Sequence, residues 1–273
     1  MSGTYRLMAI DMDGTLLNSE KKILKETIAD LRTAADAGKY LVFSTGRGLA
    51  ELRDYLEELP FIQYGICISG AFVYDFEKQQ VIHSQTLSKD LVDTIMQRGR
   101  PEEPMVHFLT DDKAYMQQSH IDHIEDYHME VYLDLYERVT EKCKDIYALY
   151  STLDRFEKIN FYHRSVASRN RTKERLSDLP VSLTYAEETS LEIVAKGVSK
   201  AYGLQKLCAF LDIDPSEAIA IGDAWNDSEI LQAAGLPVAM GNAAPEIKKL
   251  CPVVVADNNH NGVGEAVRKY LMA

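Results

Sequence analysis

Cysteine is scarce in this chain of 273 residues, and its spacing excludes the usual cysteine-based frameworks. The chain has four cysteines, at Cys67, Cys143, Cys208 and Cys251, which lie far apart and form no C-x-x-C pair. This spacing is not that of a zinc site or of a disulfide-stapled secreted domain. We therefore expect reduced thiols and a cytoplasmic protein.

Long apolar runs and surplus positive charge are also missing. The first apolar run, Leu7 to Ile10, is too short for a signal peptide, and no run approaches the roughly 20 residues that span a bilayer. Lysine and arginine total 30 against 42 aspartates and glutamates, which gives a net charge of −12. We therefore expect neither a nucleic acid nor a membrane surface as a partner.

Both ends of the chain alternate apolar runs with helical stripes. Runs typical of strands buried on both faces occupy 7–10, 41–43, 65–68, 218–221, 237–240 and 253–255. Stripes with apolar residues three or four positions apart occupy 24–35, 49–59 and 201–211, with a short one at 230–231. This alternation predicts an α/β fold in which the two ends share one parallel sheet with helices on its faces.

The middle of the chain, residues 86–188, has a different texture. The patterns there predict a helix around 91–95, a hairpin of 105–109 and 114–118, a charged helix over 121–138, a strand over 158–163 and a further charged helix. A final pair of strands is predicted at 181–186 and 191–195. Strands with one polar face favour a separate α+β unit, an open sheet covered by helices on one side.

Polar residues follow four predicted strands of the first sheet at the point where each strand ends. They are Asp11 and Asp13; Ser44, Thr45, Gly46 and Arg47; Ser69 and Gly70; and Gly222, Asp223, Asn226 and Asp227. Ligands of open parallel sheets bind outside the carboxyl ends of the strands. We therefore expect these residues to meet at one edge of the sheet.

The paired aspartates, Asp11 and Asp13, predict a cation. Two neighbouring carboxylates repel each other unless a positive charge lies between them or one stays protonated. Carboxylate oxygens without nearby histidine or cysteine suit Mg²⁺, which also takes water and substrate phosphate. Thr45 and the N–H of Gly46 suit phosphate oxygens, and Lys200 would lie at the positive end of a helix.

Each piece has an ordinary structural interpretation as well. Asp11 and Asp13 fit an Asx turn, Thr45 and Gly46 a strand end, Lys200 a solvated lysine, and Asp223 a turn. We favour a joint site, because the ordinary interpretation needs independent coincidences at the ends of four strands.

Six short motifs occur along the chain in order. They are Asp11-Met-Asp13-Gly-Thr-Leu-Leu17, Ser44-Thr45-Gly46-Arg47, Gly197-Val-Ser-Lys200, Gly222-Asp223-Ala-Trp-Asn226-Asp227, Val238-Ala-Met-Gly-Asn-Ala243 and Asn261-Gly-Val263. With this order the chain resembles haloacid dehalogenase superfamily phosphatases of the Cof-type group. The resemblance implies a Rossmann-like core of residues 1–85 and 189–273 and an inserted α/β cap of residues 86–188 that sets substrate specificity.

The resemblance also implies the roles of the acidic residues. Asp11 would attack phosphorus and form an aspartyl-phosphate, and Asp13 would protonate the leaving alkoxide and then activate water. Mg²⁺ would be held by the Asp11 carboxylate, the Asp13 main-chain carbonyl and Asp223. Asp227, counted with the metal residues, would support the metal shell or Lys200.

Other residues are expected to contact the phosphate or the substrate. Thr45 and Lys200 would stabilise the transferring phosphoryl group. The remaining candidates are Gly46, Arg47, Ser69, Gly70 and Asn226. The chain departs from the family pattern at Ser69, at Trp225 and at His260-Asn261-Gly262. These departures bear on the substrate and leave the reaction intact.

Within the predicted cap we expect ordinary structural roles for most aromatic and histidine residues. The aromatics Tyr115, Tyr127, Tyr132, Tyr136, Phe161 and Tyr162 fit a core better than a sugar platform. His120, His123 and His128 do not share one helix face, which favours a solvated surface over a metal site.

The favoured function is a Mg²⁺-dependent phosphatase of small phosphorylated metabolites, with sugar phosphates as the first class to test. A phosphomutase with the same aspartyl-phosphate chemistry and a non-catalytic phosphosugar-binding protein are the alternatives. A receiver-type signalling domain fits less well, because it is shorter and lacks a carboxylate equivalent to Asp13. We expect a monomer or a weak dimer.

Overall fold

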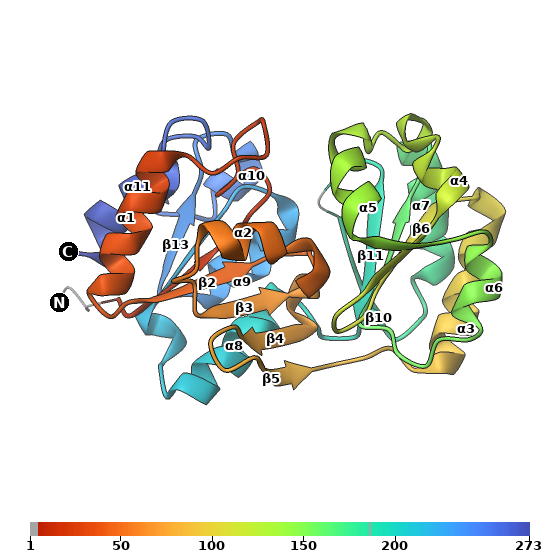
Figure 1. The fold of residues 1–273 in the computed structure, drawn as a ribbon, viewed down its shortest axis with the longest axis horizontal. Helices are drawn as coiled ribbons and strands as arrows, with labels where there is room; N and C mark the ends of the chain where they lie inside the picture. The colour runs from red at the N-terminus through yellow and green to blue at the C-terminus, as the bar shows by residue number, and fades with distance from the viewer. Residues whose placement is uncertain (1–4, 186) are drawn as a thin grey trace. The chain divides into compact units, whose positions relative to one another are not determined.

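The computed structural model describes residues 5–185 and 187–273, which form two compact units (Figure 1). Residues 5–46, 54–83 and 199–273 make up the first unit. The second unit consists of the short segment 47–53 together with the described residues of 84–198. The two ends of the chain therefore fold together, and the middle forms a unit of its own.

The sheet of the first unit has eight strands among the described residues. They are β1 (Leu7–Ile10), β2 (Tyr40–Ser44), β3 (Tyr64–Cys67), β4 (Phe72–Asp75), β5 (Gln80–Ser84), β12 (Ala218–Gly222), β13 (Leu236–Ala239) and β14 (Val253–Val254). Their order is β14-β13-β12-β1-β2-β3-β4-β5, parallel from β14 to β3, with β4 antiparallel to β3. The pairing of β1 with β12 confirms the predicted shared sheet, and β4 and β5 are additions to it.

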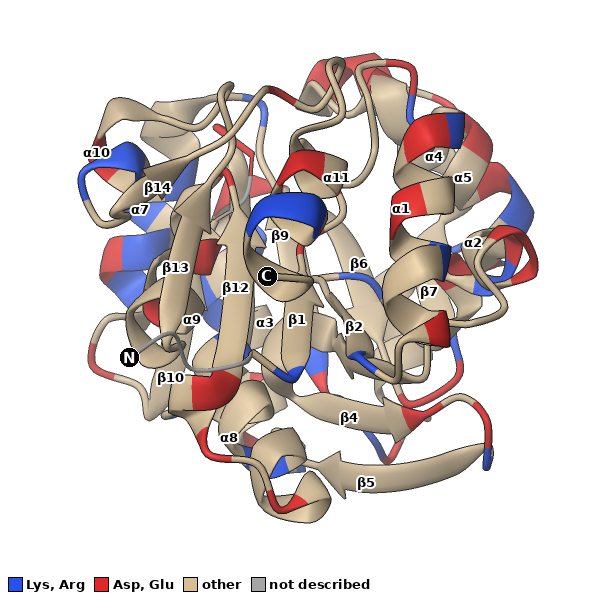
Figure 2. Ribbon diagram, turned by 90° about the vertical axis from the view of Figure 1, so that its left-hand side faces the viewer, with Lys and Arg blue, Asp and Glu red and all other residues tan. Residues whose placement is uncertain are grey.

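Helices cover both faces of this sheet (Figure 2). The helical segments are α1 (Lys25–Asp36), α2 (Arg53–Glu58), η2 (Ile68–Gly70), α8 (Lys200–Leu211), η6 (Pro215–Glu217), η7 (Trp225–Asp227), α9 (Ser228–Ala233), α10 (Pro245–Lys248), α11 (Gly262–Ala266) and η8 (Val267–Leu271). The short segment η1 (Leu49–Glu51) belongs to the second unit. The connections through α1 and α9 leave the centre of the sheet in opposite directions, so right-handed crossovers place these helices on opposite faces.

The stripe predicted as one helix over 49–59 is two short segments, η1 and α2. The carboxylate of Glu51 accepts a hydrogen bond of 2.7 Å from the N–H of Gly48, and this bond closes a tight turn at the start of the stripe. The prediction of a continuous helix was therefore wrong.

The second unit contains a six-stranded sheet with the order β10-β11-β9-β6-β7-β8. Its strands are β6 (Met105–Leu109), β7 (Ala114–Gln117), β8 (Thr140–Cys143), β9 (Lys158–Tyr162), β10 (Val181–Thr184) and β11 (Ser190–Ala195). The predicted pairs β6–β7 and β10–β11 are antiparallel neighbours. Ala186, the end of the predicted strand 181–186, lies outside the described residues. Because β11 pairs with both β9 and β10, the unit extends to 198, beyond the predicted boundary at 188.

The helical segments of this unit are α3 (Lys89–Gly99), η3 (Arg100–Glu102), α4 (Gln118–Ile121), η4 (Ile124–Tyr127), η5 (Glu130–Tyr132), α5 (Leu133–Val139), α6 (Ile146–Tyr150) and α7 (Val166–Leu176). The charged helix predicted over 121–138 is therefore broken. His128 adopts a left-handed backbone, with φ 60°, which a continuous helix does not permit.

Both faces of the second sheet carry an apolar cluster. Ile159 and Phe161 of β9 pack into one cluster with residues of α3, whereas Tyr162 packs into another with Tyr127 and Tyr136. The expectation that helices cover one side alone was therefore wrong, because the segment between β7 and β8 covers the other. All six aromatics expected in the core are buried. None of the described helices combines the length and the apolar character needed to cross a membrane.

Candidate active site

The candidate site lies at the carboxyl ends of two neighbouring strands, β1 and β12. Asp11 follows β1, and its N–H donates a hydrogen bond of 3.1 Å to the carbonyl of Ile221 in β12. Asp223 follows β12 directly. Parallel pairing in register thus brings together two aspartates that stand more than 200 positions apart in the chain.

Three carboxylates and one ammonium group form the centre of this site. Asp11, Asp223 and Asp227 each place an oxygen within 4.8 Å of the others. The Nζ of Lys200 lies 2.6 Å from Asp11 Oδ1 and 2.7 Å from Asp227 Oδ1. The side chain of Lys200 is 1 % exposed, so solvent screens its attraction to the aspartates very little. One cation therefore faces three acidic groups.

The electrostatics of the centre favour an additional positive charge. Burial is the largest cause that raises the pKa of Asp11 well above its usual value, and the negative charge of Asp227 is the second. The same two causes raise the pKa of Asp223 to about 7. Burial opposes the charged form of Lys200, but Asp11 and Asp227 together raise the pKa of this ammonium above its ordinary value. A divalent cation with a preference for oxygen ligands fits this donor set, and Mg²⁺ is such an ion.

The side chain of Asp13 does not join this centre. Its Oδ1 lies 2.9 Å from the Nζ of Lys21, and the side chain is 26 % exposed. Asp13 also falls outside the set of carboxylates whose oxygens converge among the described residues. A carboxylate beside the centre, in contact with solvent, is placed for proton transfer better than for side-chain metal binding.

Asp227 organises the loop that follows β12. Its Oδ2 accepts hydrogen bonds of 3.2 Å from the N–H groups of Asp223 and Ala224, while its Oδ1 accepts from Lys200. Asp227 thus ties the end of the short turn η7 to the two residues that precede the turn. The neighbouring Asn226 has a buried Oδ1 for which no hydrogen-bond partner is found among the described residues.

The loops after β2 and β3 are bonded to each other and lie against the start of helix α8. The N–H of Thr45 donates to Ile66 and the carbonyl of Thr45 accepts from Ser69, so the two loops are joined. Gly70 has φ 91°, and a Cβ there would lie 1.9 Å from the carbonyl oxygen of Ser199. Glycine at this position therefore lets helix α8 begin close enough to present Lys200.

The predicted phosphate- and substrate-binding residues do not all belong to one unit. Thr45, Gly46, Ser69 and Asn226 lie in the first unit, whereas Arg47 is part of the segment 47–53 of the second. Within that unit the guanidinium of Arg47 lies over the ring of Tyr132, 6.0 Å from its centroid.

Two residues that sequence reasoning missed hold Asp223 in place. The hydroxyl of Thr15 donates a hydrogen bond of 2.8 Å to Asp223 Oδ1. Gly14 has φ 83°, and a Cβ there would lie 2.3 Å from Asp223 Oδ2. Both residues belong to the same motif as Asp11 and Asp13, and this position in the sequence could have identified them as site residues.

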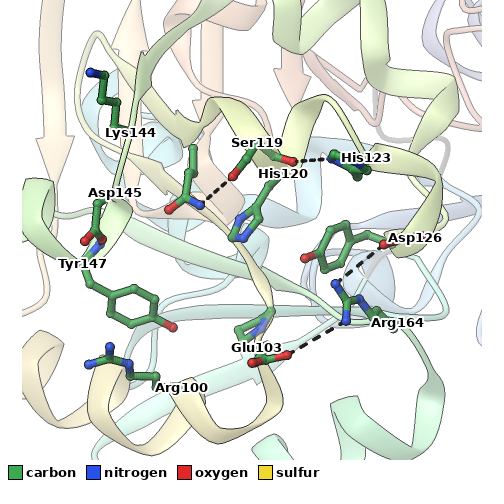
Figure 3. Close-up of a pocket in the computed structure, with 13 residues that line it drawn as sticks. Arg100, Glu103, Ser119, His120, His123, Asp126, Lys144, Asp145, Tyr147 and Arg164 are labelled. Atoms are coloured by element: carbon green, nitrogen blue, oxygen red, sulfur yellow. Dashed lines mark hydrogen bonds and ion pairs between the residues drawn. The ribbon is translucent and has the colours of Figure 1, made fainter.

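The second unit has a cavity of its own, and the predicted site residues are not among the described residues that line it (Figure 3). His120 projects into it, and Arg164 lies over the ring of Tyr127, 5.4 Å from the centroid. His123 and His128 are exposed, as predicted, whereas His120 is half-buried, and burial lowers its pKa. The expected solvated surface therefore holds for two of the three histidines.

Comparisons with known proteins agree with this architecture. The model of the haloacid dehalogenase-like hydrolase family matches residues 8–267. The putative phosphatase YxeH of Bacillus subtilis is 28 % identical over 98 % of this chain and 99 % of its own length. The 5-amino-6-(5-phospho-D-ribitylamino)uracil phosphatase YcsE of the same organism is 29 % identical, over 98 % and 96 %. A solved haloacid dehalogenase-like hydrolase from B. subtilis superposes with a TM-score of 0.87 at 26 % identity, covering 97 % of this chain and 99 % of that one.

Proposed function

This chain belongs to the haloacid dehalogenase-like hydrolase family, and we propose that it is a Mg²⁺-dependent phosphatase of small phosphorylated metabolites. The observation that carries the proposal is the buried group of Asp11, Asp223 and Asp227 around Lys200. A nucleophilic carboxylate, a fixed cation and a set of oxygen ligands are the components that phosphoryl transfer through an aspartyl-phosphate requires.

In the first step, a carboxylate oxygen of Asp11 attacks phosphorus, and the ester bond to the leaving oxygen breaks. Asp13 donates a proton to that oxygen, so the product leaves as an alcohol. Lys200 contacts Asp11 directly, which orients the nucleophile and keeps a positive charge beside the transferring group. The ion pair with Lys21 holds the carboxylate of Asp13 at the edge of the centre.

In the second step, Asp13, now a carboxylate, takes a proton from water, and the resulting hydroxide attacks the phosphorus of the aspartyl-phosphate. The bond between phosphorus and Asp11 breaks, which releases inorganic phosphate. Asp11, Asp223 and the main-chain carbonyl of Asp13 would hold Mg²⁺, which offsets the negative charge of the phosphate when bound. Asp227 and Thr15 keep Lys200 and Asp223 in position.

We assign most of the choice of substrate to the second unit, because the acidic residues and the lysine of the centre address the phosphate alone. Sugar phosphates and related polyol phosphates are the class we favour. The name of one relative, a phosphatase of a phosphoribityl compound, supports this choice.

The test is phosphate release from a panel of phosphorylated metabolites, with and without Mg²⁺. Asp11→Asn should abolish turnover, and Asp36→Asn, which alters an exposed aspartate of the first unit, should leave it unchanged. Calorimetry with Mg²⁺ alone should show weaker binding to an Asp223→Asn variant. Full activity of the Asp11→Asn variant, or of the wild-type enzyme after exhaustive chelation, would refute the proposal.

A further inference from the structure

Trp225 is the one tryptophan of the chain, and its side chain is 51 % exposed. It lies in the turn η7, two positions after Asp223 and two positions before Asp227. An indole is among the largest apolar groups a protein can bury, and leaving half of it in water forgoes part of that stabilisation. Its location beside the candidate centre therefore calls for an explanation.

The backbone that carries Trp225 is held in place. The N–H of Asp227 donates a hydrogen bond of 3.0 Å to the carbonyl of Ala224, and Asp227 Oδ2 binds the N–H groups of Asp223 and Ala224. With about 3.8 Å between consecutive Cα atoms, the Cα of Trp225 lies within about 7.6 Å of that of Asp223. The indole thus starts from a fixed point close to the place where a phosphate would be bound.

The polar and aromatic contacts of the indole also differ from those of another exposed ring of the first unit. The ring of Phe210, which is 44 % exposed, faces the ammonium of Lys78. No ring, cation or hydrogen-bond contact is found for Trp225 among the described residues. The adjacent Asn226 has a buried amide oxygen that is also unsatisfied there, and a group of this kind requires an explanation such as a ligand.

We propose that Trp225 is a specificity residue whose indole stacks on the ring of the leaving group of the substrate. The inference rests on the proposed phosphatase function and names the substrate class: phosphomonoesters whose leaving group is a ring with an apolar or aromatic face. A pyranose and a planar heterocycle share this chemistry, because both offer a face to the π-system of an indole. An acyclic leaving group gains nothing from it.

The first experiment compares wild type with Trp225→Ala and Trp225→Phe. The substrates are glycerol 3-phosphate, whose leaving group is an acyclic alcohol, glucose 6-phosphate, which has a pyranose, and uridine 5′-monophosphate, which has a heterocycle. Phe210→Ala, which removes an exposed ring from the same unit, is the matched control.

We expect wild type to prefer at least one ring substrate over glycerol 3-phosphate. For that substrate Trp225→Ala should lower kcat/KM about tenfold, or about 1.4 kcal/mol, mainly through KM. Trp225→Phe should retain part of the preference, and the hydrolysis of glycerol 3-phosphate should change less than about twofold in either variant. Phe210→Ala should behave as wild type. Comparison of the two ring substrates shows whether the indole stacks on a pyranose or on a heterocycle.

The outcomes separate the two proposals. A wild-type enzyme that hydrolyses none of the three with Mg²⁺ would count against the phosphatase function for this class of substrate. Hydrolysis of glycerol 3-phosphate without a preference for either ring substrate, or an equal effect of Trp225→Ala on all three, would overturn the stacking role alone.

The second experiment measures binding without turnover. In an Asp11→Asn protein the fluorescence of Trp225, the one tryptophan, should change saturably with the preferred ring phosphate in the presence of Mg²⁺. Inorganic phosphate should leave it nearly unchanged, because that ligand has no ring. Binding of the ring phosphate that calorimetry detects but the fluorescence does not report would contradict direct contact with the indole.

Discussion

Replacing Lys200 by methionine tests whether its ammonium holds the carboxylates of the centre together. Nζ lies 2.6 Å from Asp11 and 2.7 Å from Asp227, in a side chain that is 1 % exposed. Methionine keeps much of the volume but leaves both carboxylates without their cation. Removing one partner of a buried ion pair costs about 3–5 kcal/mol. Because burial already raises the pKa of Asp11, this carboxyl can bind a proton and reduce the loss, so we expect about 3 kcal/mol.

The assay is urea unfolding near neutral pH in the presence of a chelator. The fluorescence of Trp225 reports on the first unit, which contains both this residue and Lys200. Lys269→Met is the matched control: Lys269 pairs with Glu265 on the surface of the same unit and is 61 % exposed, so its removal should leave the unfolding midpoint unchanged.

A double variant sharpens the test. Adding Asp227→Asn to Lys200→Met removes one of the uncompensated buried charges, so part of the lost stability should return. The two substitutions should therefore be non-additive, as expected for residues in direct contact. Lys200→Met with the unfolding midpoint of wild type, or strict additivity in the double variant, would show that the ammonium does not organise the centre.

Three further predictions concern Gly14 and Asp13 of the candidate site and His163 of the second unit. Gly14→Ala should lower activity more than tenfold and weaken Mg²⁺ binding measured by calorimetry, because its Cβ would lie 2.3 Å from Asp223 Oδ2; wild-type affinity would contradict this. Asp13→Asn should slow hydrolysis of alkyl phosphates by roughly 10² to 10⁴-fold, yet give a burst of nitrophenol from nitrophenyl phosphate, whose leaving group needs no proton; equal slowing without a burst would argue against an acid–base role. Burial lowers the pKa of His163 to about 4. Acidification from pH 6.5 to 4 protonates this imidazole in the unfolded chain first and costs up to roughly 1.4 kcal/mol per pH unit. His163→Gln should reduce this dependence of the unfolding free energy on pH, measured by urea unfolding followed by circular dichroism. An unchanged slope would show that His163 does not contribute to it.

Local patterns predicted the central strands of the first unit, β1, β2, β3 and β12, because these strands are buried almost throughout. All four residues of β1 are at most 1 % exposed, so the strand appears in the sequence as an unbroken apolar run. β5 lacks this signal: Val81 is 44 % exposed at the edge of the sheet, and the strand went unpredicted. The break at His128 and the extension of the second unit through β11 depend on backbone conformation and on pairing with distant strands. Periodicity carries no information about either.

In the candidate site, too, the sequence predicted which residues take part but not every contact that they make. The motifs predicted that Asp11 and Asp223 meet at one edge, because the register of parallel strands determines where their ends meet. Lys200 reaches the same place from the start of helix α8. The role of Asp227 stayed open between metal ligand and support for Lys200. In the fold its Oδ1 faces the ammonium and its Oδ2 accepts from two main-chain N–H groups, so metal binding would have to share or displace one of these contacts. This arrangement favours the supporting role. The sequence left the choice open because the bonds of Asp227 form both within its own turn and to Lys200, 27 positions away.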